Sequence, residues 1–370
     1  MSGAIPPARR PPFTECSRRV NIPLTRAAHN PYCDSAGAPA GAGCAGAGVP
    51  FPDARRPAAM NAKVLFRAAG RRCGAAAGAC LLALASCGGG GDSSPPRTEV
   101  IRIQNTGSDT MVNLAQEWAE AYKKVDPSVS VEVAGGGSSV GITQLQEGFV
   151  DLANASREMT EAERAEMKRK TGKEPVEWIV AYDGLAVYVH KDNPVEVMSL
   201  DELASIYGEN GAAKKWSDLG IDNRAGCPSD EIIRVSRQSS SGTFQYFREV
   251  VLHKGDFKRG AQSLSGSKDV VDAVGKTPCA IGYSGMGYKD DHVKFVKIDK
   301  EKGGPAYEPS IASVLDKTYP IARSLIMYTA GQPTGPVKKY LEWIMSPAGQ
   351  AIVAHAGYIP HSEQTAETTK

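Results

Sequence analysis

Three short, hydroxyl-rich turns constrain the fold of this chain more than any other feature of its sequence. They span residues 107–110, 135–139 and 237–243, and each follows a run of β-forming residues and opens an amphipathic helical pattern. Strand, turn and helix in regular alternation favour an α/β fold around a mainly parallel sheet. In such sheets ligands bind outside the carboxyl ends of the strands, where all three turns fall.

The composition of these turns predicts the kind of ligand. A helix start carries backbone N–H groups without intrahelical partners and about half a positive charge from the helix dipole, so it attracts anions. All three turns contain Ser or Thr, and the third adds Arg237, whose planar guanidinium matches a pair of phosphate oxygens. We therefore expect one tetrahedral oxyanion held mostly by neutral donors. The alternatives are plain helix caps at Ser138 and Ser139 and a surface position for Arg237.

The distribution of the elements predicts two lobes joined by two extended segments. Strands are expected at 100–103, 129–133 and 151–155, with helices following the first two. An extended run at 176–189 is long enough to cross from one lobe into a second, and the run at 319–328 is the expected return. The second lobe is expected to contain helices at 200–207, after Thr243 and at 269–274, and two further helices then rejoin the first lobe.

These crossings give the expected boundaries. Lobe 1 comprises residues 99–184 and 322–360, and lobe 2 comprises residues 185–321. The polar stretch 361–370 is predicted to be a disordered tail.

The N-terminal quarter of the chain has the features of a leader. Residues 60–86 begin with basic residues, continue with an apolar run too short to span a bilayer, and end just before Cys87 in a pattern that resembles the bacterial lipoprotein signal. We expect Cys87 to carry a lipid and residues 87–98 to form a flexible tether. Residues 1–59 show no apolar periodicity, so the simplest interpretation is that translation starts at Met60, with a disordered segment as the alternative.

The charge balance changes once this leader is set aside. Residues 1–87 hold 11 of the 43 Lys and Arg residues and 3 of the 41 Asp and Glu residues, which leaves a net charge of −6 beyond them. A net acidic chain gives no support to nucleic-acid binding. An anion site on such a chain has to work through local donors.

The cysteines follow the same division. Six of the eight lie within residues 1–87, so only Cys227 and Cys279 remain in the exported part. Each precedes a predicted strand, at 232–236 or 280–283, and parallel neighbours would place both at one edge of the sheet. In an oxidising compartment two such cysteines favour a disulfide over a metal site.

Taken together, residues 100–360 resemble the phosphate-binding proteins of bacterial phosphate-specific ABC transporters. The Arg-x-x-x-Ser-Gly-Thr run at 237–243, followed by Ala-Ile-Gly-Tyr at 280–283, carries most of the resemblance. It implies a two-lobed periplasmic-binding-protein architecture of type II with two crossover strands, closing around one inorganic phosphate. It also implies delivery of the phosphate to an ABC transporter permease. We expect no cofactor and a monomeric, lipid-anchored receptor in the periplasm or at the cell surface.

The resemblance assigns phosphate contacts to residues in each of the three turns and at the end of the third strand. They are Ser108, Asp109, Thr110, Ser138, Ser156, Arg237, Ser241, Gly242 and Thr243.

One position departs from the family pattern. Some members have an aspartate after the Ala-Ser of the third strand, where it accepts the proton of hydrogen phosphate, but here Arg157 occupies that place. Asp183 and Asp109 are the candidates to replace it. Arg157 and Arg237, one from each lobe, are expected to grip the anion together. The alternatives are a structural turn role for Asp183 and an Arg157 that faces solvent or pairs only with a protein carboxylate.

Two other functions compete with this interpretation. The first keeps the binding role but changes the ligand to sulfate, molybdate or another oxyanion. The second is a secreted, phosphatase-like enzyme that uses Ser241 as nucleophile. The sequence has no Gly-x-Ser-x-Gly elbow, and its histidines lie in no recognisable catalytic motif, so we expect a receptor without chemistry.

Overall fold

The computed structural model describes residues 100–222 and 227–361. They belong to the compact unit Gly89–Lys370; the other unit, Met1–Gly88, lies outside the described residues. The predicted leader, the lipidation site Cys87, the tether and the tail from residue 362 onward therefore lie outside them as well.

The first lobe is built as the sequence predicts, from strands followed by helices. The parallel strands β1 and β2 are Ile101–Gly107 and Val129–Ala134, and β3 is Leu152–Ala155 on the other side of β1. The connecting helices are α1 (Val112–Val125) and α2 (Ser138–Gln146), and α3 follows β3 at Glu161–Thr171. Parallel pairing brings the carboxyl ends of all three strands, and the turns that follow them, to the same edge of the sheet.

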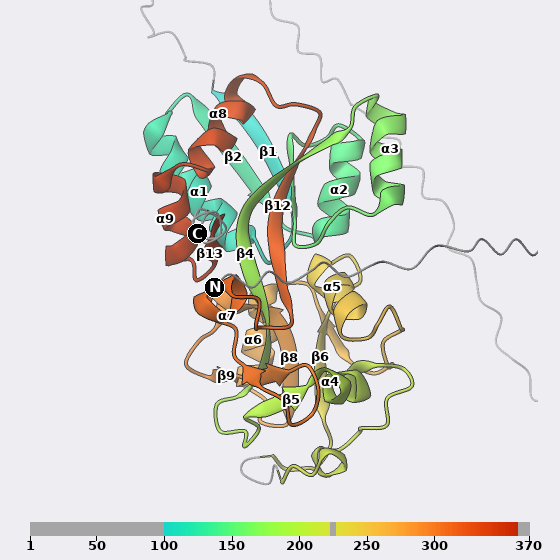
Figure 1. Cartoon of the computed structure of the whole chain (residues 1–370). Helices are drawn as coiled ribbons and strands as arrows, with labels where there is room; N and C mark the ends of the chain where they lie inside the picture. The colour runs from blue at the N-terminus through green and yellow to red at the C-terminus, as the bar shows by residue number, and fades with distance from the viewer. Residues whose placement is uncertain (1–99, 223–226, 362–370) are drawn as a thin grey trace, which may run out of the picture. The chain divides into compact units, whose positions relative to one another are not determined.

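Two long strands join the lobes, as predicted. Strand β4 (Pro175–His190) pairs first with β12 (Ala322–Ala330) and then, further along, with β8 (Ala280–Gly285). Figure 1 shows β4 and β12 side by side along the middle of the molecule. One sheet therefore runs through both lobes, in the order β2-β1-β3-β12-β4-β8-β6-β7.

The sheet is mixed rather than mainly parallel. Strand β12 is antiparallel to both β3 and β4, and β4 is antiparallel to β8. The reason is the crossing itself, because β4 leaves the first lobe and β12 returns to it in the opposite direction. The prediction of a mainly parallel sheet holds only for part of each lobe. Parallel pairing within this sheet is confined to β1 with its two neighbours and to β6 (Ile233–Arg237) with β7 (Gln262–Leu264) and β8.

The second lobe contains the predicted helices and several strands that the sequence did not indicate. Helices α4 (Leu200–Tyr207), α5 (Gly242–Val250) and α6 (Ser267–Gly275) lie where helical spacing was found. The unpredicted elements are all five residues or shorter. They are β5 (Val197–Ser199), β7, β9 (Val293–Phe295), β10 (Lys297–Asp299), β11 (Ala306–Tyr307), α7 (Ile311–Leu315) and the 3₁₀ turns η1 (Trp216–Leu219) and η2 (Met286–Tyr288).

The C-terminal helices return to the first lobe. Helices α8 (Gly335–Ile344) and α9 (Pro347–His355) pack on α1, and strand β13 (Ile359–Pro360) pairs with β4. The indole of Trp118 is completely buried in this interface and donates to the carbonyl of Gly349 over 2.8 Å. His361, the last described residue, stacks on Tyr182. None of the helices in the described ranges is both long and apolar enough to cross a membrane.

The predicted disulfide is present. Cys227 and Cys279 are bonded, with their Cα atoms 5.1 Å apart. Strands β6 and β8 are parallel neighbours, with Ile233 opposite Ala280, so both cysteines lie at the amino ends of these strands. The bridge is therefore at the opposite end of the second lobe's strands from the hydroxyl-rich turn that follows Arg237.

Candidate anion site between the lobes

The carboxyl ends of β1, β3 and β6 meet at a cluster of hydroxyl side chains. Every member follows one of these strands or, in the case of Ser138, begins α2 after β2, and every member is 2% exposed or less. The members, called here the hydroxyl cluster, are Ser108, Thr110, Ser138, Ser156, Ser241 and Thr243. All six were predicted from the sequence as contacts of an anion.

Hydrogen bonds join these hydroxyls both within and between the lobes. Ser108 Oγ donates to Ser156 Oγ over 2.8 Å, and the backbone N–H of Ser156 donates to Ser138 Oγ over 3.1 Å. Thr110 and Thr243, from opposite lobes, share a hydrogen bond of 2.8 Å. The three turns therefore form one continuous polar surface, as the sequence led us to expect.

Glycine is required where the two lobes come closest. A Cβ atom on Gly242, the first residue of α5, would lie 2.2 Å from Ser138 Oγ and 2.7 Å from Ser156 Oγ. A Cβ on Gly137, which has a φ of +99°, would lie 2.4 Å from the carbonyl oxygen of Ser240. The glycines in the second and third turns thus allow the backbones of the two lobes to approach each other.

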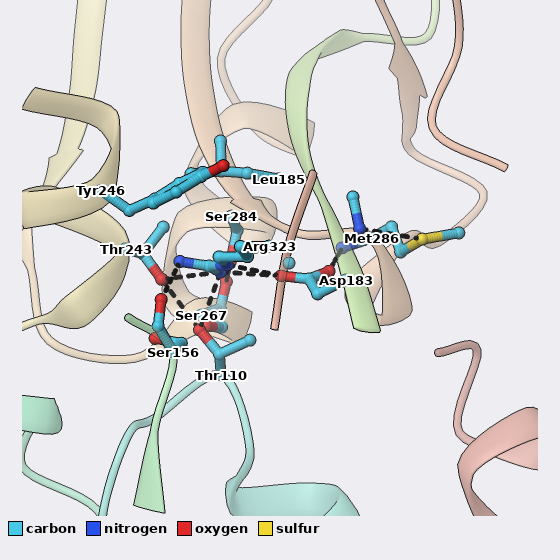
Figure 2. Close-up of polar contacts among 12 residues, drawn as sticks. Thr110, Ser156, Asp183, Leu185, Thr243, Tyr246, Ser267, Ser284, Met286 and Arg323 are labelled. Atoms are coloured by element: carbon cyan, nitrogen blue, oxygen red, sulfur yellow. Dashed lines mark hydrogen bonds and ion pairs between the residues drawn. The ribbon is translucent and has the colours of Figure 1, made fainter. Parts of the chain in front are cut away.

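Arg323 lies against the hydroxyl cluster, although the sequence analysis did not single it out. It comes from β12, and its side chain is 2% exposed. Its Nη2 donates to Thr243 Oγ1 over 3.1 Å, and its Nη1 donates to the carbonyl of Ser156 over 3.1 Å. The ring of Tyr246 lies 5.7 Å from its guanidinium carbon. Figure 2 shows this guanidinium between Thr243 and Asp183, with Thr110 and Ser156 beside it.

Asp183 is fully buried next to this arginine. Its Oδ2 accepts from Arg323 Nη2 over 2.7 Å and from Arg323 Nε over 3.0 Å, while its Oδ1 accepts from the backbone N–H of Met286 over 3.0 Å. These bonds appear in Figure 2. Asp183 lies on β4 and Met286 lies in the second lobe, so the carboxylate joins the crossing strands to that lobe.

Arg237, which is buried, and Asp109, whose side chain is 12% exposed, form a second ion pair, which connects the lobes directly. Arg237 Nη2 lies 3.2 Å from Asp109 Oδ2, and Arg237 Nη1 donates to Ser267 Oγ over 2.8 Å. Burial lowers the pKa of Arg237, and the neighbouring carboxylate of Asp109 opposes that shift. The other oxygen of Asp109 accepts from the N–H of Gly136, so this aspartate also holds the glycine turn in place.

Tyr288 adds a neutral contact to the same aspartate. Its hydroxyl donates to the backbone carbonyl of Asp109 over 2.9 Å. Burial raises the pKa of Tyr288 to about 12, so the hydroxyl remains a donor at neutral pH.

Arg157 is directed toward a different partner. Its guanidinium donates to both carboxylate oxygens of Glu163, over 2.7 and 2.8 Å, to the carbonyl of Glu158, and to Ser139 Oγ over 3.1 Å. Burial alone would raise the pKa of Glu163, but hydrogen bonds from Arg157 and Thr160 outweigh it and hold that pKa below its usual value. The structure therefore brings Arg157 to a protein carboxylate, the alternative considered above, and places Arg323 against the hydroxyl cluster.

The charges of the site balance without a ligand. Arg323 faces Asp183, and Arg237 faces Asp109. The other polar groups gathered at the site are chiefly hydroxyls and the backbone N–H groups at the starts of α2 and α5. Beside the site a groove of ≈ 1150 Å³ runs between the lobes, lined among others by Arg157, Ser239, Gln245, Tyr246 and Arg323. Within residues 100–222 and 227–361, no group of three or more His, Cys, Asp and Glu side chains is arranged to hold a metal ion.

Comparison with known proteins agrees with this architecture. The family model described as a PBP superfamily domain matches residues 91–348, which is more than half of the chain. The class defined by the fold and by the polar site between the lobes is thus that of the two-lobed substrate-binding proteins.

Individual relatives narrow the class to one family. The phosphate-binding protein PstS of Pseudomonas aeruginosa is 35% identical over 275 residues, covering 72% of this chain and 84% of that protein. PstS of Staphylococcus saprophyticus is 30% identical over 304 residues, covering 80% of this chain and 91% of that protein. The chain belongs to the PstS family of phosphate-binding proteins, within the PBP superfamily.

Solved structures give the same result. A phosphate ABC transporter substrate-binding protein from Clostridium perfringens, with bound phosphate, is similar with a TM-score of 0.61 and 30% identity, covering 70% of this chain and 99% of that one. An ABC-type phosphate transport receptor from Vibrio cholerae is similar with a TM-score of 0.56 and 25% identity, with the same coverage. The expected two-lobed type II architecture with two crossover strands is confirmed.

Proposed function

We propose that this protein is an extracytoplasmic receptor that binds inorganic phosphate between its lobes and delivers it to an ABC transporter permease. The observation that carries the proposal is the hydroxyl cluster, in which six buried hydroxyls that follow β1, β2, β3 and β6 lie together beside Arg323 at the junction of the lobes. A small tetrahedral anion suits this arrangement because hydroxyls can turn to donate to whichever oxygen faces them. The names of the relatives, phosphate-binding protein PstS, support the same ligand.

In this proposal both lobes contact the phosphate. Ser108, Thr110, Ser138 and Ser156 contact the phosphate from lobe 1. Ser241, Gly242 and Thr243 contact it from lobe 2, where the start of α5 adds backbone N–H groups and a positive dipole end. Residues 99–184 and 322–360 move as one body and residues 185–321 as the other.

The two arginines have different tasks. Arg323 donates to the phosphate directly, because its guanidinium already contacts hydroxyls of both lobes. Arg237 and Asp109 approach each other when the lobes close, so their pair couples closure to binding. Arg323 thus has the role that was predicted for Arg157, as the arginine of lobe 1 that contacts the anion.

Asp183 is the proposed acceptor for the proton of hydrogen phosphate. It is fully buried, and its partner Arg323 contacts Thr110 and Thr243 of the hydroxyl cluster, whereas the partner of Asp109, Arg237, bonds to Ser267 and to the carbonyl of Ser265. A buried carboxylate repels sulfate, because sulfate has no proton to share at neutral pH. The carboxylate therefore weakens the binding of sulfate relative to that of phosphate. Asp109 is the second candidate for this role.

We propose that the protein has no catalytic step. The hydroxyl of Ser241, the serine a hydrolase would use, accepts from the backbone N–H of Thr243 as a helix cap. Among the described residues, the histidine rings that bond to other side chains pair with Tyr182, Asp192 and Glu117, none of which belongs to the hydroxyl cluster. Release of phosphate from a chromogenic monoester by the purified protein would contradict this part of the proposal.

Calorimetry tests the ligand. The purified protein is stripped of bound anion and titrated with phosphate, arsenate and sulfate. We expect one phosphate per chain, similar binding of arsenate because of its matching shape and protonation, and much weaker binding of sulfate. Preferential binding of sulfate or molybdate would favour the other-oxyanion interpretation.

We further propose that the mature protein is a monomer that begins at a lipidated Cys87 and is held at the membrane by that lipid. The support is the leader pattern of residues 60–86, which lies outside the described residues. Intact-mass analysis of the native membrane fraction tests it. A peptide from residues 1–59 in that fraction would overturn the start at Met60.

A further inference from the structure

Ser139 connects the two lobes through both its backbone and its side chain. It lies in the first turn of α2, next to Ser138 of the hydroxyl cluster. Its N–H donates to the carbonyl of Ser240 in the second lobe over 3.1 Å. Its Oγ accepts from Nε2 of Gln245, on α5 of the second lobe, over 2.9 Å. The same Oγ accepts from Arg157 Nη2, in the first lobe, over 3.1 Å.

Arg157 is fixed independently of the second lobe. Its side chain is 8% exposed, and Glu163 accepts from it with both carboxylate oxygens. Glu163 is itself fixed, because it forms the capping box of α3 with Thr160. The guanidinium is therefore held in one place by the first lobe, whether or not Gln245 is near.

This fixed cation determines how Ser139 presents its oxygen. A hydroxyl oxygen has two acceptor positions, and the charged donor of Arg157 occupies one of them. The other is then available to the amide of Gln245. A serine without this neighbour would rotate freely and lose conformational freedom when the lobes meet.

The chain of contacts lies at the groove between the lobes. Arg157 and Gln245 both line the groove between the lobes, and Ser139 links them across it. Gln245 also donates to the carbonyl of Ser239, in the turn that precedes α5. Separation of the lobes has to break the bond between Ser139 and Gln245.

We propose that Arg157, Ser139 and Gln245 form a latch that holds the lobes closed over the bound anion, with Arg157 as a positioning residue that acts through Ser139. This inference rests on the proposed function, since it assumes an anion in the hydroxyl cluster. The latch slows the departure of the anion, because its bond between the lobes is one of those that must break before the lobes separate. It does not affect the encounter with the open form.

Stopped-flow measurement of inorganic phosphate dissociation tests the latch. Gln245→Ala and Ser139→Ala should each raise the dissociation rate about five- to tenfold, the effect of one hydrogen bond, and leave the association rate unchanged. Gln116→Ala is the matched control, because Gln116 is an exposed glutamine on α1. An unchanged dissociation rate in Gln245→Ala overturns the proposal.

Replacing Arg157 alone would leave the carboxylate of Glu163 without its partner, so the role of Arg157 is tested with a double variant. Arg157→Met combined with Glu163→Gln should raise the dissociation rate by the same factor as Ser139→Ala. Arg164→Met, which breaks the ion pair of Arg164 with Glu177, is the control for loss of an arginine near α3. A loss of affinity of 100-fold or more, not matched by Ser139→Ala, would make Arg157 a phosphate ligand and overturn its positioning role.

A combined variant tests whether the residues act through one oxygen. When Arg157→Met and Glu163→Gln are added to Gln245→Ala, the dissociation rate should rise no further, because Ser139 has already lost its partner in the other lobe. Multiplicative effects would overturn the shared mechanism. Thermal unfolding without phosphate verifies that each variant is folded. If the parent protein binds no phosphate, the proposed function fails, whereas binding with unaltered kinetics in the variants rejects the latch alone.

Discussion

Asp183 and Arg323 are direct partners across the two strands that join the lobes. They face each other in the antiparallel pairing of β4 with β12, and the carboxylate accepts from the guanidinium over 2.7 and 3.0 Å. Both side chains are buried almost completely. The register of the two strands sets this ion pair, because Asp183 and Arg323 stand directly opposite each other in the ladder of β4 and β12. The pair is therefore a reference point for a ligand bound between the lobes.

Loss of Arg323 should remove phosphate binding and destabilise the fold. Arg323→Met leaves the carboxylate of Asp183 buried without a cation, which typically costs about 3–5 kcal/mol. Adding Asp183→Asn should restore most of that stability but not the affinity. Urea unfolding without phosphate and calorimetry with phosphate measure the two effects. Near-normal phosphate affinity in Arg323→Met would show that this arginine is not a ligand.

Asp183→Asn alone should narrow the difference between phosphate and sulfate. The amide no longer accepts a proton from phosphate or repels a sulfate oxygen, so phosphate binding weakens and sulfate binding strengthens. Competition calorimetry at neutral pH measures the ratio of the two affinities, with Asp109→Asn measured in parallel. If only Asp109→Asn changes the ratio, Asp109 is the proton acceptor, and if neither does, selectivity arises elsewhere.

The sequence predicted the general architecture because strands, helices and crossings are long enough to show periodicity. The helix expected after the first strand is α1, which buries Leu114 and Trp118, and the extended run expected at 176–189 is β4. Strands β10 and β11 were not predicted, because a strand of two or three residues is too short to show an alternating pattern of apolar and polar residues. They form only because neighbouring segments of the second lobe supply their partners.

The site was predicted where it depends on local sequence and missed where it depends on register. Hydroxyls at strand ends were found from their turns. Arg323 was not, because its role follows from standing opposite Asp183, and hydrophobic patterns do not fix which residues of two crossing strands pair. Arg157 was assigned to the ligand from its place beside Ser156. The capping sequence from Thr160 to Glu163 was a readable signal that a carboxylate lay close enough to bind it.

Gly242→Ala should block closure without harming the fold. The added methyl would lie 2.2 Å from Ser138 Oγ, across the junction of the lobes. Overpacking of this kind costs about 1–3 kcal/mol, so phosphate affinity should fall about 10- to 100-fold. Gly304→Ala is the control, because its nearest neighbour is the carbonyl of Glu301 at 3.0 Å, away from the site. Equal affinity in the two variants would mean that the lobes do not approach this closely around phosphate.

Acid should weaken the phosphate-free protein partly through Glu163. Its pKa is lower in the folded protein than in the unfolded chain, so its contribution to stability is complete above the unfolded value of about 4.3 and is lost as the pH falls through the lowered folded pKa. Urea unfolding at several pH values between about 6 and 3 measures this. In Glu163→Gln the free energy of unfolding should fall less steeply over that range, while a slope equal to that of the parent protein would contradict the assignment.

Removal of the disulfide should lower stability and leave phosphate binding intact. Cys227 and Cys279 are 52 residues apart, for which the chain-entropy model gives about 4 kcal/mol from restriction of the unfolded state. The double change of both cysteines to serine should reduce the free energy of unfolding by roughly 2–4 kcal/mol. Phosphate affinity should not change, because the bridge lies at the amino ends of β6 and β8 and the hydroxyl cluster lies beyond the carboxyl end of β6. The parent protein under reducing conditions is the control and should unfold like the serine variant. A large loss of affinity in that variant at temperatures where it is folded would mean that the bridge shapes the turn after Arg237.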